Sequence, residues 1–236
     1  MPYRRLPKTD AGRIKAMKTV LDKEEAFNSR TRIVEWKTLS AIQLAYDKFM
    51  GAYLYHAGCK KNQVKHSGEG DPSKAKARMF VSHFIQVLNL AVQRGEIRAS
   101  YKPLYGLQED DYTVPDLTSN EQLVFWGKNI IKGEKERLKK GGVPVTNPSI
   151  AKVSVHFDIF FEQYSRQKRL QELTSNSGTD LGQLREETDK VILDLWNQVE
   201  AAYANLPLAE RYAKCMDYGV VYYYRRKEPH IEGLDL

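Results

Sequence analysis

The amino-acid sequence predicts an all-α protein, a bundle of six or seven helices in a single domain. Apolar side chains recur with three-and-four spacing through most of the 236 residues. Residues that begin and end helices flank these stretches. The turns between the stretches are short, as they are in helical bundles.

Two segments of the chain begin alike, which indicates an internal duplication. Asp71-Pro72-Ser73 and Asn147-Pro148-Ser149 each lead into an aromatic-rich helix. On this interpretation two related halves, residues 1–117 and 118–236, pack about a pseudo-twofold axis. Coincidence is the alternative, because Asp or Asn followed by Pro-Ser is a common way to begin any helix.

The first half of the chain predicts three helices. One covers about residues 10–27, and a longer one covers about residues 34–64 and ends in the turn at 67–70. Asp71 then caps a third helix with Pro72 at its first position, and Arg94-Gly95 ends it.

Residues 96–117 are irregular and rich in turn residues. A connection of this length inside a compact domain is either packed against it or functional. Its acidic run, Glu109 to Asp111, lacks the alternating oxygen ligands of a calcium site and is interpreted as surface.

The second half predicts a helix that begins in the capping box Thr118 to Glu121 and ends at Gly141-Gly142. The basic run Lys132 to Lys140 is interpreted as its solvated end. The helix after Pro148 is expected to stop at a turn over Ser175 to Gly178.

Two more helices and an extended segment complete the chain. The helices cover about residues 180–204 and a shorter stretch after Pro207. Tyr218 to Tyr224 consists of residues that favour β-structure, with a partner expected within 97–107. Alternatively, this tyrosine-rich segment docks extended on the helices.

Composition sets the class of protein. Hydrophobic residues make up 42% of the chain and charged residues 28%, and no stretch approaches the roughly 20 apolar residues of a membrane span. No apolar signal-peptide core follows the basic start. Cys59 and Cys215 are too few for a disulfide framework and are expected as reduced, buried thiols of a cytoplasmic protein.

Charge is distributed unevenly along the chain. Residues 1–70 hold 14 Lys and Arg against 7 Asp and Glu, whereas residues 148–236 hold 11 against 14. The two ends are expected to complement each other within the fold or across a subunit interface.

No recognised catalytic, nucleotide-binding or metal-binding spacing occurs, so no catalytic residue, cofactor or metal ligand is assigned. His83 and His156 are the first candidates for a ligand site. They lie one turn apart on the two related helices, where they would bind a metal or an anion; a half-buried core role is the simpler explanation. His56 and Cys59 lack the further partners of a metal site.

Tyr222, Tyr224, Arg225 and Arg226 place aromatic rings beside cations, the combination used for single-stranded nucleic acids. Packing of alternate tyrosines against the domain is the favoured interpretation. The nucleic-acid hypothesis also includes further basic residues as phosphate contacts: Arg4, Arg5, Lys60, Lys61, Lys65 and Lys227.

Several short motifs together resemble a family of all-helical bacterial proteins with no known activity. They are Tyr105-Gly106-Leu107, Trp126-Gly127, Ile130-Ile131-Lys132-Gly133-Glu134, Gly141-Gly142-Val143-Pro144, Asn147-Pro148-Ser149 and Tyr218-Gly219-Val220. The resemblance covers most of the chain. It implies a helical fold and a bacterial cytoplasmic setting, and no site.

Together these observations predict a non-enzymatic binding or assembly module with a protein partner or a second copy, a homodimer, and no membrane contact. Nucleic-acid binding is the first alternative. A metal- or ligand-binding protein centred on His83 and His156 is the second.

Overall fold

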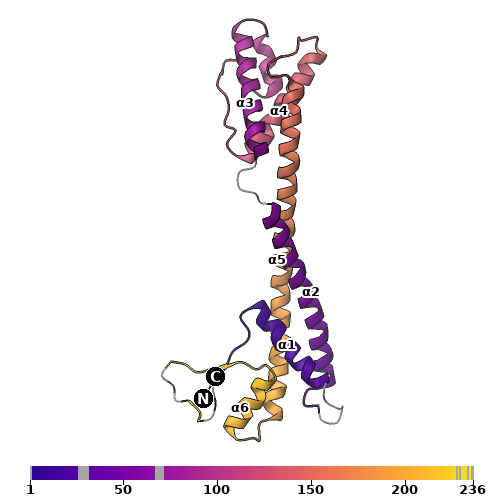
Figure 1. The fold of residues 1–236 in the computed structure, drawn as a ribbon, viewed down its shortest axis with the longest axis vertical. Helices are drawn as coiled ribbons and strands as arrows, with labels where there is room; N and C mark the ends of the chain where they lie inside the picture. Colours follow the sequence, from indigo (N-terminus) through magenta and orange to yellow (C-terminus); the bar gives the residue numbers. More distant parts are fainter. Residues whose placement is uncertain are drawn as a thin grey trace. The chain divides into compact units, whose positions relative to one another are not determined.

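The computed structural model describes residues 2–25, 32–66, 72–226, 228, 230–232 and 234. Over these ranges it contains seven helices, one of them a 3-10 helix, and two strands of two residues, which confirms the all-α prediction (Figure 1). The expected cap Asp71 and the turn at 67–70 lie outside the described residues. In chain order the elements are β1 (Tyr3–Arg4), α1 (Asp10–Glu25), α2 (Trp36–His66), α3 (Pro72–Gln93), η1 (Ala99–Tyr105), α4 (Asn120–Lys139), α5 (Ile150–Ala202), α6 (Leu208–Asp217) and β2 (Tyr222–Tyr223).

The chain divides into two compact units. Unit 1 consists of Met1–Asn62 and Glu172–Leu236, and unit 2 of Gln63–Gln171. The expected halves, 1–117 and 118–236, divide the chain at other points, and the duplication stays a prediction. The two helices that suggested it, α3 and the first part of α5, both belong to unit 2.

Unit 1 has a core built from α1, α2, α6 and the second part of α5. Met17, Phe49 and Trp196 are fully buried in it. Removing an apolar side chain such as Met17 or Phe49 from water stabilises the fold by about 1.5–3 kcal/mol. Cys59 and Cys215 are both buried and free, as expected.

Ion pairs join the basic start of the chain to its acidic end within unit 1. Arg13 Nη2 lies 2.8 Å from Asp189 Oδ2, and Arg4 Nη1 lies 2.9 Å from Glu200 Oε2. Arg185 reverses the pattern by pairing with Asp10 at 2.8 Å. The predicted charge complementarity is therefore satisfied in part inside the fold.

The tyrosine-rich segment has a different partner from the one expected. β2 pairs antiparallel with β1, with Tyr3 opposite Tyr223 and Arg4 opposite Tyr222. The expected pairing with residues 97–107 is wrong, because that region belongs to unit 2 and forms the 3-10 helix η1.

Helix α5 continues without a break through Ser175 to Gly178, so the turn expected there is wrong. The small residues serve helix packing instead. Ser177 Oγ donates to Thr174 O and lies 2.9 Å from Nδ1 of His56 on α2. A Cβ added at Gly178 would lie 3.1 Å from His56 Cε1, so glycine allows α2 to approach α5.

Unit 2 has a core built from α3, η1, α4 and the first part of α5. Gly127 permits the contact between α4 and α5, because a Cβ there would lie 2.2 Å from the Phe157 ring. The predicted C-terminal end of α4 is confirmed, because Gly141 takes a left-handed φ of 83°. At the other end the expected capping box of Thr118 and Glu121 is wrong by one residue: Ser119 is the N-cap and accepts a hydrogen bond from the Gln122 amide.

The connection over residues 96–117 is packed against unit 2 and encloses a buried lysine. Lys102, on η1, is fully buried. Its Nζ donates to the carbonyl oxygens of Asp111 at 2.6 Å and Glu109 at 3.3 Å, and lies 4.1 Å from the centre of the Tyr112 ring. The acidic run is exposed, as expected, and its backbone also solvates this cation.

Candidate functional site

Unit 2 contains a buried, hydrogen-bonded cluster of Tyr105, Glu134 and Arg137. Tyr105 Oη donates to Glu134, and Arg137 Nε lies 2.8 Å from Tyr105 Oη and 3.0 Å from Glu134 Oε2. Arg137 Nη2 donates to Glu134 Oε1 at 2.8 Å and to Val143 O at 2.7 Å. The Val145 amide donates to Glu134 Oε1 at 3.1 Å.

These hydrogen bonds determine the charge states of the cluster. Burial favours a protonated Glu134, but the bonds from Arg137, Tyr105 and Val145 outweigh it and hold the pKa of Glu134 below its usual value. Burial, reinforced by the bond to Glu134, raises the pKa of Tyr105. A neutral phenol, a carboxylate and a guanidinium therefore persist together at neutral pH.

The cluster holds η1, α4 and the following loop together. Glycines permit its close packing: a Cβ at Gly133 would lie 2.6 Å from the Tyr105 ring, and one at Gly142 would lie 2.6 Å from Arg137 Nη1. Both Glu134 and Tyr105 are fully buried, so neither reaches a substrate. The interpretation of Lys132 to Lys140 as a solvated helix end is wrong at Glu134 and Arg137, which face the core.

The two candidate histidines lie on different helices of unit 2. His83 is exposed on α3. His156 is half-buried on α5, and its ring stacks on Phe80 with centroids 4.3 Å apart and planes 3° from parallel. Among the described residues, the ring contact of His156 is with Phe80 and not with His83.

The tyrosine and arginine candidates lie in unit 1, where their side chains contact neighbouring residues. Tyr222 is buried, and its hydroxyl donates to Glu200 at 2.5 Å. Tyr224 stacks on His230 at 4.0 Å and accepts a hydrogen bond from the Ile231 amide. Arg225 and Arg226 are both exposed, and the guanidinium of Arg225 lies 4.0 Å from the centre of the Tyr3 ring.

His56 and Ser177 resemble a catalytic pair only in their distance. Ser177 is 3% exposed, and its hydroxyl proton is directed at Thr174 O. Ser177 therefore accepts a hydrogen bond from His56 Nδ1 and is not activated as a nucleophile. In the described part of the chain, no three His, Cys, Asp or Glu side chains gather closely enough to hold a metal ion.

A groove between α4 and the first part of α5 is the best candidate for a binding surface. Its volume is about 460 Å³. Ile131 of α4 and Phe157 and Phe161 of α5 form its apolar floor. Four exposed lysines on α4 line it: Lys128, Lys132, Lys135 and Lys139.

The lysines form one helical stripe because their spacings are four, three and four residues. Glu136 and Asp158 also line the groove. Glu136 lies 3.9 Å from Lys132, and Asp158 accepts a hydrogen bond from Ser154. Glu134, which the sequence places within the same run, is buried on the opposite face and does not neutralise the stripe. The groove is therefore positively charged.

The signal for this groove was present in the sequence. Lys128, Lys132, Lys135 and Lys139 have helical spacing, but the linear run also contains Glu134, Glu136 and Arg137. The sequence does not show that Glu134 and Arg137 are buried. Once the structure places these two side chains in the core, the four lysines remain as an exposed stripe.

No protein-family model, curated protein or solved structure matches the chain. The resemblance to a bacterial helical family stays a prediction. Within the described ranges, no helix is both long and apolar enough to cross a membrane.

Proposed function

We propose that the protein is a non-enzymatic binding module whose α4/α5 groove receives an acidic segment of a partner protein. The observation that carries the proposal is the stripe of four exposed lysines beside a phenylalanine floor. A groove between two helices with an apolar floor and charged walls fits an amphipathic helix of opposite charge.

The overall charge of unit 2 supports an anionic partner. Residues 63–171 hold 17 Lys and Arg against 12 Asp and Glu. Charges at the rim of a binding surface attract the partner and raise the association rate more than they raise affinity. Binding is therefore expected to weaken as salt rises.

An acidic peptide is favoured over a single-stranded nucleic acid because the aromatic rings are occupied. Phe157 is 3% exposed and stacks on Phe161 with planes 11° from parallel. Lys128 Nζ lies 4.3 Å from the centre of the Phe161 ring. Stacking of a base requires an exposed aromatic face, which the buried Phe157 lacks, and the half-buried Phe161 ring is already contacted by Phe157 and Lys128.

The test compares two labelled probes by fluorescence anisotropy. One is a synthetic amphipathic helix of Leu and Glu, about 18 residues or five turns long. The other is an oligo(dT) of equal length. The variant replaces Lys128, Lys132, Lys135 and Lys139 by Gln. The control replaces four exposed lysines of unit 1, Lys18, Lys37, Lys48 and Lys60, and thus changes net charge equally.

We expect the groove variant to weaken peptide binding by about tenfold or more at low salt, roughly 1.4 kcal/mol, and the control to leave it near wild type. If both variants lost peptide affinity equally, the loss would be due to net charge alone, and this result would contradict the proposal. Tighter binding of oligo(dT), lost in the groove variant, would replace the peptide by a nucleic acid.

A cytoplasmic location and self-association are parts of the same proposal. Two buried free cysteines suit a reducing compartment. The homodimer stays a prediction, and light scattering coupled to size-exclusion chromatography tests it. A monomer at every salt concentration would exclude self-association, but it would not contradict the proposal that the groove binds a peptide.

A further inference from the structure

A second concave site in unit 2 lies where the end of α3, the segment that follows it and the end of α4 meet. Its volume is about 440 Å³, within the roughly 300–1,000 Å³ of small-molecule sites. Part of its lining is apolar, with Val87, Ala91, Ile97 and Val143. The rest is polar and includes the loop Gly141 to Thr146.

Arg137 lines this cavity, and one of its three guanidinium nitrogens makes no hydrogen bond to a described residue. Its side chain is 3% exposed, and its Nε and Nη2 are engaged by Tyr105, Glu134 and Val143. Nη1 has no hydrogen-bond partner among the described residues. Nη1 is not one of the fully buried polar atoms without a partner, so it reaches the solvent of the cavity, where its N–H groups can meet an acceptor.

Gly142 keeps Nη1 uncovered. A Cβ at this position would lie 2.6 Å from Nη1. The φ of Gly142 is not in the left-handed region, unlike that of Gly141, so the backbone does not require glycine there. The close approach of Arg137 is the physical reason for a residue without a side chain.

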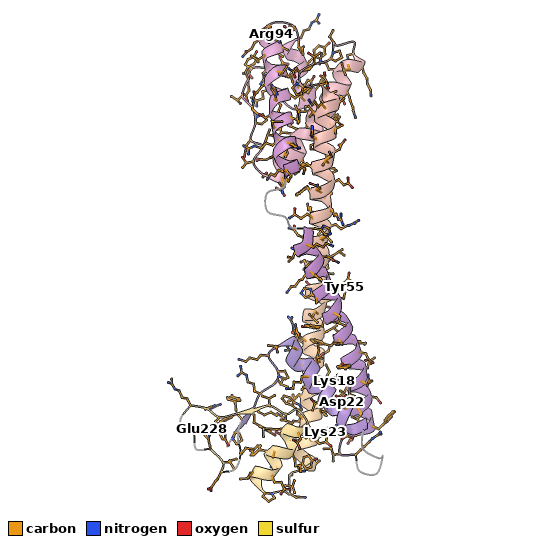
Figure 2. The ribbon with its side chains drawn as sticks, viewed as in Figure 1. Lys18, Asp22, Lys23, Tyr55, Arg94 and Glu228 are labelled. Atoms are coloured by element: carbon orange, nitrogen blue, oxygen red, sulfur yellow. The ribbon has the colours of Figure 1, made fainter. Side chains whose placement is uncertain are left out.

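The cavity has an excess of positive charge. Arg94, at the end of α3 (Figure 2), is neutralised by Glu96 through bonds of 2.6 and 2.9 Å. Glu134 balances Arg137. Arg98 and Lys140 also line the cavity, are exposed, and form no ion pair with any described residue. Two of the cations that line the cavity therefore remain uncompensated by any described carboxylate.

We propose that this cavity binds a small organic anion. A carboxylate or phosphate oxygen accepts a hydrogen bond from Arg137 Nη1, and Arg98 and Lys140 attract its charge. The apolar body of the ligand packs against Val87 and Ile97. Glu134 and Tyr105 hold the guanidinium in place before the ligand arrives, so little ordering is needed on binding.

The test uses NMR titration of the ¹⁵N-labelled full chain with phenyl phosphate, benzoate and inorganic phosphate at constant ionic strength. The Arg137 Nε–H signal reports directly, because this buried group is hydrogen-bonded to Tyr105 and Glu134. We expect saturable shifts of this signal and of the Gly142 and Val143 amides. Whichever of phenyl phosphate and benzoate binds with the higher affinity identifies the preferred anionic group, phosphate or carboxylate.

Matched variants separate this cavity from the α4/α5 groove. Replacing Arg98 and Lys140 by Gln is expected to weaken binding by about tenfold, since both are exposed and neither pairs with a carboxylate in the described ranges. Replacing Lys132 and Lys139 by Gln removes the same charge from the groove and leaves anion binding unchanged. Equal weakening by both pairs would show a diffuse ionic effect and overturn the proposal.

A third variant tests the role of Nη1. Gly142→Ala is expected to cover it and abolish the shifts, while thermal unfolding shows that the protein is folded. A folded Gly142→Ala protein that binds phenyl phosphate like wild type would exclude Nη1 as the anchor. No saturable shift with any probe in the wild-type protein would remove the site altogether.

Discussion

Arg137 and Glu134 form a buried ion pair three residues apart on α4, with Nη2 and Oε1 separated by 2.8 Å. Every oxygen of the carboxylate accepts at least one hydrogen bond, from Arg137, Tyr105 or the Val145 amide. Tyr105 of η1 and the backbone of Val143 and Val145 in the loop after α4 all form hydrogen bonds with this pair. Loss of the pair is therefore expected to disturb the packing of η1, α4 and the loop.

Glu134→Gln is expected to destabilise the protein by about 3–5 kcal/mol, because it leaves the Arg137 charge buried without a counter-ion. Tyr105→Phe removes a hydroxyl and keeps the ion pair, so about 1–3 kcal/mol is expected. Urea denaturation followed by circular dichroism measures both. A Glu134→Gln variant within 1 kcal/mol of wild type would contradict a buried charged pair.

Acid is expected to unfold unit 2 through the same carboxylate. The folded pKa of Glu134 lies below its unfolded value, so its stabilising contribution is complete above the ordinary glutamate pKa, about 4.3. The contribution is lost as pH falls from there through the folded pKa. Denaturation midpoints of wild type should decline below about pH 4 more steeply than those of Glu134→Gln. Parallel declines would show that other carboxylates dominate.

Gly127→Ala and Gly182→Ala are expected to change stability in opposite directions. At Gly127 the new Cβ would overlap the Phe157 ring, so overpacking should cost about 1–3 kcal/mol. At Gly182, on α5, nothing lies within 4 Å, and alanine should stabilise the helix by about 0.5–1 kcal/mol. Thermal unfolding of the pair checks the α4/α5 contact, and a neutral Gly127→Ala would refute it.

Lys102 is expected to resist acetylation in the folded protein. It is fully buried, donates to two backbone carbonyls and has a pKa lowered by burial. Brief treatment with acetic anhydride followed by peptide mass spectrometry should label Lys128 and Lys132 and leave Lys102 unmodified. Labelling of Lys102 at the same rate would mean that residues 96–117 open readily; denatured protein supplies the reference rate.

Local signals predicted the helices well and their partners poorly. The end of α4 at Gly141 was predicted, and its start was predicted to within one residue, because capping groups act within one turn of the helix. The break at Ser175 to Gly178 was wrong because the same small residues suit both a turn and a close helix contact, and His56, over a hundred residues away, decides between them.

The candidate sites failed or succeeded for a similar reason. Tyr105 and Glu134 are 29 residues apart, and no local pattern reveals that their side chains meet. The pairing of Tyr3 with Tyr223 is more remote still, and two-residue strands leave no periodic pattern. By contrast, the lysine stripe of α4 follows from helical spacing once Glu134 and Arg137 are known to face inward.

During synthesis of the chain, unit 2 can fold before unit 1. Its residues, 63–171, are contiguous, whereas unit 1 needs residues from both ends of the chain. On the ribosome, the α4/α5 groove and the anion cavity can therefore form while Trp196 and Tyr222 are still to be made. Met17 and Phe49 share a core with Trp196, so the core of unit 1 can be completed only after residues 172–236 have been made.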